Sequence, residues 1–124
     1  MNVHAPGRPV KCVINTNDAS SVQTFTVYDV ATQEVITFGT NDIFVLYLLS
    51  ISNGDSAVVA SVFDDLDGAG DADNSDTLFK KSMNAKEQAG FAYTRGLPLK
   101  RIPKFLASTS SANTSVVLYG DIQE

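Results

Sequence analysis

The feature that most constrains the fold is the stretch 43–63, in which two apolar, β-favouring runs flank the dipeptide Asn53-Gly54. A two-residue type I′ turn needs φ above zero at both central positions, which Asn tolerates and Gly adopts freely. The pattern therefore predicts a β-hairpin whose strands run over 43–51 and 57–63. The first run is apolar at almost every position, which predicts an inner strand covered on both faces.

Shorter β-favouring segments surround this hairpin, separated by polar turns and without a convincing helix pattern. The candidate strands cover residues 10–14, 21–30, 34–38, 77–83, 90–94, 104–109 and 115–120. Residues 95–103 contain Pro98 and Pro103 and are expected to be irregular, because proline cannot donate to a strand ladder. Eight or nine short strands predict an all-β protein, an antiparallel β-sandwich or jelly roll.

The chain of 124 residues is expected to form one domain, with an extended N-terminal arm at 1–9 and a β-sandwich over 10–124. No apolar run approaches the ~20 residues that cross a bilayer, and the N-terminus has no apolar signal core. The sequence therefore predicts no membrane contact and no secretion by the general route.

The chain contains one cysteine and one histidine. An internal disulfide and a Cys/His zinc site are thus both excluded within one chain. Cys12 lies in a strand pattern and is expected to be a small apolar core residue. His4 lies in the arm, where no nucleophile is linked to it, and is expected to be exposed.

Charge is distributed unevenly along the chain. The net charge is −5, six aspartates lie between 64 and 76, and seven of the nine basic residues lie between 80 and 104. A negative chain is a poor match for nucleic acid, whose affinity comes from clustered Lys and Arg. The two charged regions are suited to pairing with each other or with a partner, or they form ordinary solvated surface.

The aspartate-rich loop is the candidate metal site. Calcium takes six to eight hard oxygens, and the candidate ligands are Asp65, Asp67, Asp71, Asp73 and Asp76. The spacing does not match an EF-hand, because the required Gly and the final Glu are missing. A solvated loop without a ligand, which the composition favours, and an acidic docking surface are the alternatives. Apart from calcium at this loop, no cofactor is expected.

The basic residues are the candidate partner-binding set, namely Arg8, Arg95, Lys100, Arg101 and Lys104. Contact with an acidic protein surface is one interpretation, and plain surface charge is the other. The four tyrosines could form a platform for a sugar, although each lies in a strand pattern. No phosphate-binding loop, catalytic triad or dry carboxylate pair is indicated, so the sequence predicts a protein that is not an enzyme.

Several strand endings carry a family likeness. They are Ser-Ile-Ser-Asn-Gly at 50–54, Phe-Ala-Tyr-Thr-Arg-Gly-Leu-Pro-Leu at 91–99, Phe-Leu-Ala-Ser-Thr-Ser at 105–110 and Val-Val-Leu-Tyr-Gly at 116–120. The order of these segments over roughly 43–121 resembles the small β-sandwich structural proteins of tailed bacteriophages, in particular head decoration (cement) proteins.

That resemblance implies a non-enzymatic virion protein, made in the host cytoplasm, that binds the outer capsid surface. It also implies a homo-oligomer, commonly a trimer, that clamps neighbouring subunits of the major capsid protein. A carbohydrate- or receptor-binding module of a virion knob or tail is the alternative, and a tail or connector component is a third possibility. No residue-level site transfers with the resemblance.

Overall fold

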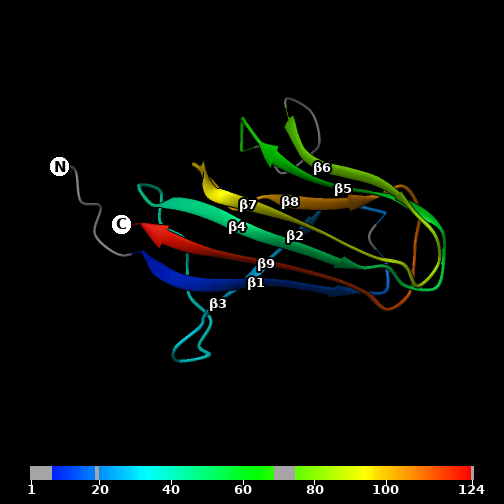
Figure 1. Ribbon diagram of the computed structural model, residues 1–124, viewed down its shortest axis with the longest axis horizontal. Coiled ribbons are helices and arrows are strands. Elements are labelled where there is room, and N and C mark those ends of the chain that lie inside the picture. Colours follow the sequence, from blue (N-terminus) through cyan, green and yellow to red (C-terminus); the bar gives the residue numbers. More distant parts are fainter. Residues whose placement is uncertain (1–6, 19, 69–74, 124) are drawn as a thin grey trace.

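A computed structural model describes residues 7–18, 20–68 and 75–123, which contain nine β-strands and no helix (Figure 1). The strands of the first half are β1 (Arg8–Thr16), β2 (Gln23–Thr24), β3 (Thr26–Asp29), β4 (Ile43–Ser52) and β5 (Val58–Asp65). The remaining strands are β6 (Ser75–Met83), β7 (Gln88–Leu99), β8 (Lys104–Ala107) and β9 (Thr114–Gln123). No helix long and apolar enough to cross a membrane occurs in these ranges.

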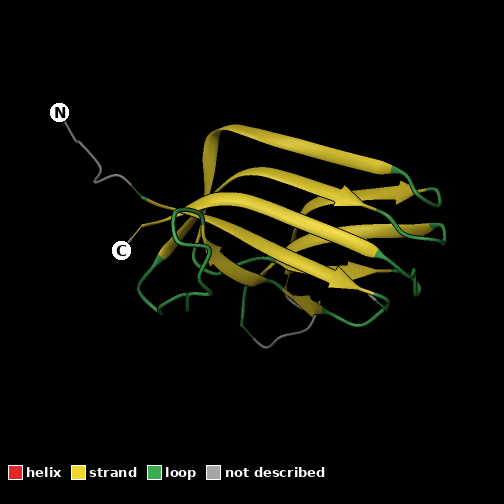
Figure 2. Cartoon of the chain, turned by 90° about the horizontal axis from the view of Figure 1, so that it is seen from below, coloured by secondary structure: helices red, strands yellow, loops and turns green. Residues whose placement is uncertain are grey.

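The strands form two packed antiparallel sheets, with the connecting loops gathered at the two ends of the body (Figure 2). Sheet A has the order β3-β1-β9-β4-β7, and sheet B has the order β2-β8-β5-β6. The pairs β1·β9, β2·β8, β4·β7 and β5·β6 nest like one long hairpin. Rolling that hairpin brings β4 beside β9 and β5 beside β8, which is the jelly-roll arrangement. The predicted fold class is confirmed.

The predicted hairpin at Asn53-Gly54 is wrong. β4 belongs to sheet A and β5 to sheet B, so this dipeptide carries the chain from one sheet to the other. Neither residue has a positive φ among the described backbone. Gly54 is needed for space instead, because a Cβ there would lie 1.7 Å from the carbonyl oxygen of Ala112. The innermost hairpin is β5–β6, and the aspartate-rich loop connects its strands.

Several strand boundaries differ from the sequence pattern. β1 begins at Arg8, so the last two residues of the predicted arm belong to the sheet, while residues 1–6 lie outside the described ranges. Residues 34–38 contribute only an isolated bridge at Val35. β7 continues through Pro98 to Leu99, because β7 is an edge strand and a proline there removes no ladder bond that the sheet needs.

β4 is an inner strand, as predicted, but its two faces are not equally covered. Phe44, Leu46 and Leu49 point between the sheets and are fully buried, whereas Tyr47 and Leu48 are 38% and 40% exposed. A bulge at 46–48 shifts the register against both neighbouring strands. One face of β4 therefore lies at the molecular surface.

The core lies between the sheets and is built from the inward residues of both. Sheet A contributes Val10, Phe44, Leu49 and Leu118, and sheet B contributes Phe105 among others. Cys12 is also fully buried in this cluster, as expected for a small apolar residue. Burial raises the pKa of its thiol to about 12.

The buried thiol gives a direct test of core integrity. Because the thiolate is the reactive form and the pKa is about 12, Cys12 should not react with Ellman's reagent in the native protein at pH 8. In a denaturant it should react stoichiometrically at the rate of a free cysteine. Rapid reaction of the native protein would contradict the placement of Cys12 between the sheets.

Candidate interaction surface

The five basic residues predicted to bind a partner do not form one cluster. Arg8 donates from Nε to Asp29, at the end of β3. Arg95 lies in the irregular middle of β7 and Lys100 follows that strand, and both are exposed. Lys104 begins β8 in the other sheet and pairs with Thr24 and Phe63. Arg95 and Lys100 are therefore the exposed members that form no ion pair with a described residue.

Arg101 is directed at the acidic end of its own chain. Its Nη1 donates to the carbonyl oxygen of Leu66 at 3.3 Å, and its guanidinium lies against Gly68. Burial raises the pKa of Asp64, the Arg101 charge opposes that change, and the charges of Asp76 and Asp65 add to it. The acidic and basic regions thus meet within one molecule at this point.

The calcium prediction remains a prediction. Asp65 is buried at the end of β5, and the carboxylate-bearing residues Asp64 and Asp76 are directly opposed across β5 and β6. Within the described ranges no group of three or more acidic, histidine or cysteine side chains is placed to hold a metal ion. Asp71 and Asp73 lie outside those ranges.

The outer side of sheet A carries a surface that we call the apolar face. Pairing places Tyr28, Lys11, Tyr119 and Leu48 in one row across four strands, all pointing away from the core. Tyr47, beside Val45 at the bulge, and Val13 and Val117 extend it. The apolar face therefore comprises Val13, Tyr28, Val45, Tyr47, Leu48, Val117 and Tyr119.

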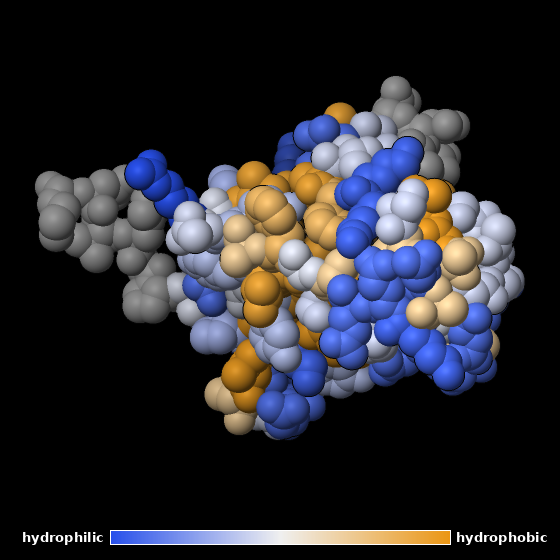
Figure 3. Space-filling view, turned by 45° about the vertical axis from the view of Figure 1, so that its right-hand side comes forward, coloured by the Kyte–Doolittle hydropathy of each residue, from blue (hydrophilic) through white to orange (hydrophobic). Residues whose placement is uncertain are grey.

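This surface is more than a scatter of single exposed residues. Tyr47, Leu48 and Tyr119 are each about 40% exposed or slightly less. On the side seen in Figure 3, apolar surface gathers toward the middle and gives way to hydrophilic surface toward the turn end. The outer side of sheet B is mixed, because Ser61, Lys80 and Ser82 lie there beside Val59 and Leu106. Exposed contiguous apolar surface marks a contact site in soluble proteins.

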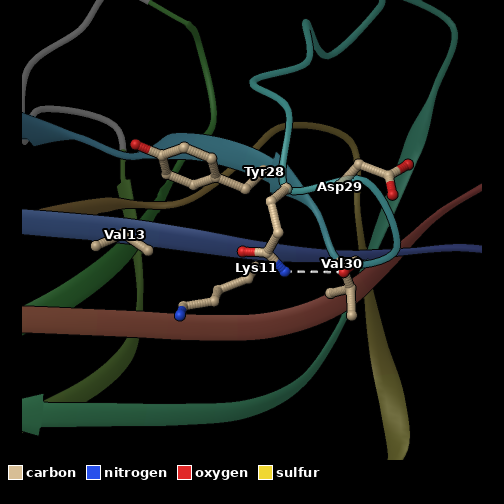
Figure 4. Close-up of a pocket in the computed structure, with 6 residues that line it drawn as sticks. Lys11, Val13, Tyr28, Asp29 and Val30 are labelled. Atoms are coloured by element: carbon tan, nitrogen blue, oxygen red, sulfur yellow. Dashed lines mark hydrogen bonds between the residues drawn. The ribbon is translucent and has the colours of Figure 1, made fainter.

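A shallow pocket of about 170 Å³ borders the apolar face at β1 and β3 (Figure 4). Lys11 and Val13 of β1 and Tyr28 and Asp29 of β3 line it, together with Val30 and Gln33 from the segment after β3. Gln33 has φ of 64° and donates from Nε2 to the carbonyl oxygen of Val30 at 2.9 Å. The pocket is thus held by its own loop contacts.

Tyr93 is the one tyrosine that does not join this side. Its hydroxyl donates to the carbonyl oxygen of Leu78 at 3.0 Å and so links the edge of sheet A to the edge of sheet B. Burial raises the pKa of the Tyr93 hydroxyl. The Tyr93 ring packs edge-on against the Phe91 ring, with the two ring centroids 4.8 Å apart. Tyr93 therefore closes the open side of the sandwich.

The Arg8–Asp29 pair makes the stability pH-dependent. The Arg8 hydrogen bond is the main cause that lowers the pKa of Asp29, and the Thr32 and Ala31 N–H groups add to it. A carboxyl with a lowered pKa stabilises the fold above its unfolded pKa of about 3.9 and loses that effect as the pH falls through its folded value.

Asp29→Asn should therefore lower Tm at pH 7, and its deficit relative to the natural chain should shrink as the pH falls below about 4. Thermal unfolding between pH 7 and pH 2 measures both curves. A deficit that stays constant over this range would show that the charge of Asp29 does not contribute.

Comparison of the chain with protein-family models, with curated proteins and with solved structures finds no match. The fold is therefore shown by the structure alone, as a small two-sheet β-sandwich.

Proposed function

We propose that this chain is a non-enzymatic structural protein of a virion, of the decoration type that binds the outer capsid surface and stabilises the head. The observation that carries the proposal is the apolar face, with Tyr47, Leu48 and Tyr119 exposed on sheet A. Such a surface acts by burying area against another protein. The resemblance of the strand endings to decoration proteins suggests that the partner is a phage capsid. The jelly roll itself is compatible with this role but serves lectins as well.

The basic segment is the proposed contact with the major capsid protein. Arg95 and Lys100 are exposed at the edge of sheet A and the turn that follows it. Neither is in an ion pair with another described residue. Exposed charges of this kind accelerate association with an acidic surface and fix its register. Arg8 and Arg101 are left out of this contact, because Asp29 and the Leu66 carbonyl already hold them.

Co-sedimentation with purified heads that lack this protein tests the proposal. We expect saturable binding at a fixed ratio to the major capsid protein, and heads that resist heat better when coated. The double variant Arg95→Glu, Lys100→Glu should weaken binding about tenfold or more, equivalent to about 1.4 kcal/mol. Lys80→Glu, on the outer side of sheet B, is the matched control and should bind normally.

Two results would count against a decoration role. One is the absence of saturable binding to heads. The other is that heads assembled without the protein are as stable to heat as coated heads.

A sugar-binding module is the second candidate, and one observation favours it. Tyr28, Tyr47 and Tyr119 share the apolar face, and tyrosine rings with a polar hydroxyl suit surfaces that are partly apolar and partly wet. A glycan array, screened with and without calcium, separates this candidate from the first. Specific glycan binding that Tyr119→Ala abolishes would favour the sugar-binding module.

A further inference from the structure

The apolar face carries two charged residues near its centre. Lys11 on β1 and Asp121 on β9 are the charged residues at outward positions of β1, β3, β4 and β9. Lys11 pairs with Tyr119, and Asp121 lies two residues further along β9, so the two charges are diagonal neighbours. Such neighbours are about 7–8 Å apart in a sheet.

Neither charge forms an ion pair with another described residue. The Lys11 side chain extends along the sheet toward the Val13 side (Figure 4), whereas Asp121 pairs with Pro9 on the other side of Lys11. The ion pairs of the described residues are Arg8–Asp29 and Lys81–Glu87, and neither includes Lys11 or Asp121. Among the residues that the structure describes, one cation and one anion without an ion pair are therefore diagonal neighbours on an apolar surface.

A surface of this kind is complementary to itself. In a two-fold interface the same patch meets on both subunits, so a residue that contacts a second residue is contacted by it in return. A two-fold axis between Lys11 and Asp121 would place each lysine opposite the partner's aspartate, with two ion pairs at the middle. Because β9 is the central strand of sheet A, that axis also gives the largest overlap of the two faces.

The size of the face is sufficient. Four strands about 4.8 Å apart and about eight residues of about 3.3 Å each make a face of about 500 Å². Two facing copies would bury about 1,000 Å², which reaches the minimum expected of a biological interface. Half-exposed tyrosines, such as Tyr47 and Tyr119, are frequent at the energetic centre of such contacts.

We propose that the apolar face binds a second copy of this chain, so that two sheets A pack face to face about a two-fold axis. Lys11 and Asp121 set the register, and the tyrosine and aliphatic side chains supply the buried area. The pairing goes beyond the proposed head-binding role, because it covers the apolar face with a second decoration subunit and leaves the exposed Arg95 and Lys100 as the contact with the head. A dimer would cover the tyrosines and exclude a glycan from the same face.

Sedimentation equilibrium over a range of protein concentrations tests the pairing. The natural chain should approach twice the monomer mass of 13.3 kDa as the concentration rises. Lys11→Glu alone and Asp121→Lys alone should each raise the dissociation constant about tenfold or more, because like charges then face each other. The double variant Lys11→Glu, Asp121→Lys should restore association. Lys80→Glu makes the same charge change as Lys11→Glu on sheet B and should leave the dimer intact.

The double variant keeps the test independent of folding. If a single variant failed to associate only because it was unstable, reversing the second charge would not restore its association. A monomer at all concentrations, a trimer, or a dimer that neither single variant weakens would overturn the pairing. Co-sedimentation with heads is measured separately, so that failure of the pairing and failure of the head-binding role are distinguishable.

Discussion

Gly54→Ala should destabilise the protein by about 3 kcal/mol or more and lower Tm by about 10 °C or more. The cause is lack of space, since the new Cβ would lie 1.7 Å from the Ala112 carbonyl oxygen and 2.6 Å from its carbon. Those atoms cannot move freely, because the same oxygen accepts the Asp55 N–H at 3.0 Å. Urea unfolding followed by circular dichroism gives the free energy.

Gly39→Ala is the matched control. Its Cβ would also come close to a neighbour, at 2.9 Å, but that neighbour is the carboxylate end of Asp42, which can move at the cost of the one hydrogen bond that it accepts from the Gly39 N–H. The control should therefore cost no more than about 1 kcal/mol. Equal stability of the two variants would contradict the crowding of the chain at the crossover between the sheets.

Asn53→Ala should cost about 2–4 kcal/mol, because Asn53 is buried and its side chain satisfies three loops at one end of the sandwich. Its Nδ2 donates to the carbonyl oxygens of Ser56 and Asn84, both at 2.8 Å. Its Oδ1 accepts the Gly54 N–H at 2.9 Å and lies 3.2 Å from the hydroxyl of buried Ser111. Alanine would leave these groups without partners and without access to water.

Asn15→Ala provides the comparison, since Asn15 is exposed at an outward position of β1. That substitution should change the free energy of unfolding by no more than about 0.5 kcal/mol. Chemical denaturation of both variants under the same conditions gives the difference. If Asn53→Ala were as mild as Asn15→Ala, water would have to replace the buried amide, and the loops would not depend on it.

The strands and their packing were largely predictable because alternation and β-branched residues report which face is buried. β1, β4, β5, β6, β8 and β9 all lie where such patterns occur. The link between β4 and β5 was not predictable in this way. Asn53-Gly54 satisfies the local rule for a tight turn, but the burial of Asn53 and the approach of Ala112 decide its role, and both depend on residues about 60 positions away.

The candidate surface was predictable only in part. Charge indicated Arg95 and Lys100, but it could not show that Asp29 holds Arg8 or that Arg101 is directed at the Leu66 loop. The apolar face was missed, although the signal was present in alternate positions of β9, where Val117 and Tyr119 sit among small or polar outward residues. Assembling the face requires knowing that β1, β9 and β4 are neighbours in sheet A. Only the three-dimensional structure gives that order.

Hydroxyl-radical footprinting of the dilute and the concentrated chain tests most directly whether the apolar face is a contact surface. Tyr47, Leu48 and Tyr119 should be oxidised readily in the dilute protein and become protected on association. Leu66 and Phe91, which are exposed elsewhere, should react equally in both. Unchanged reactivity of the three face residues, with the protein fully associated, would contradict the assignment.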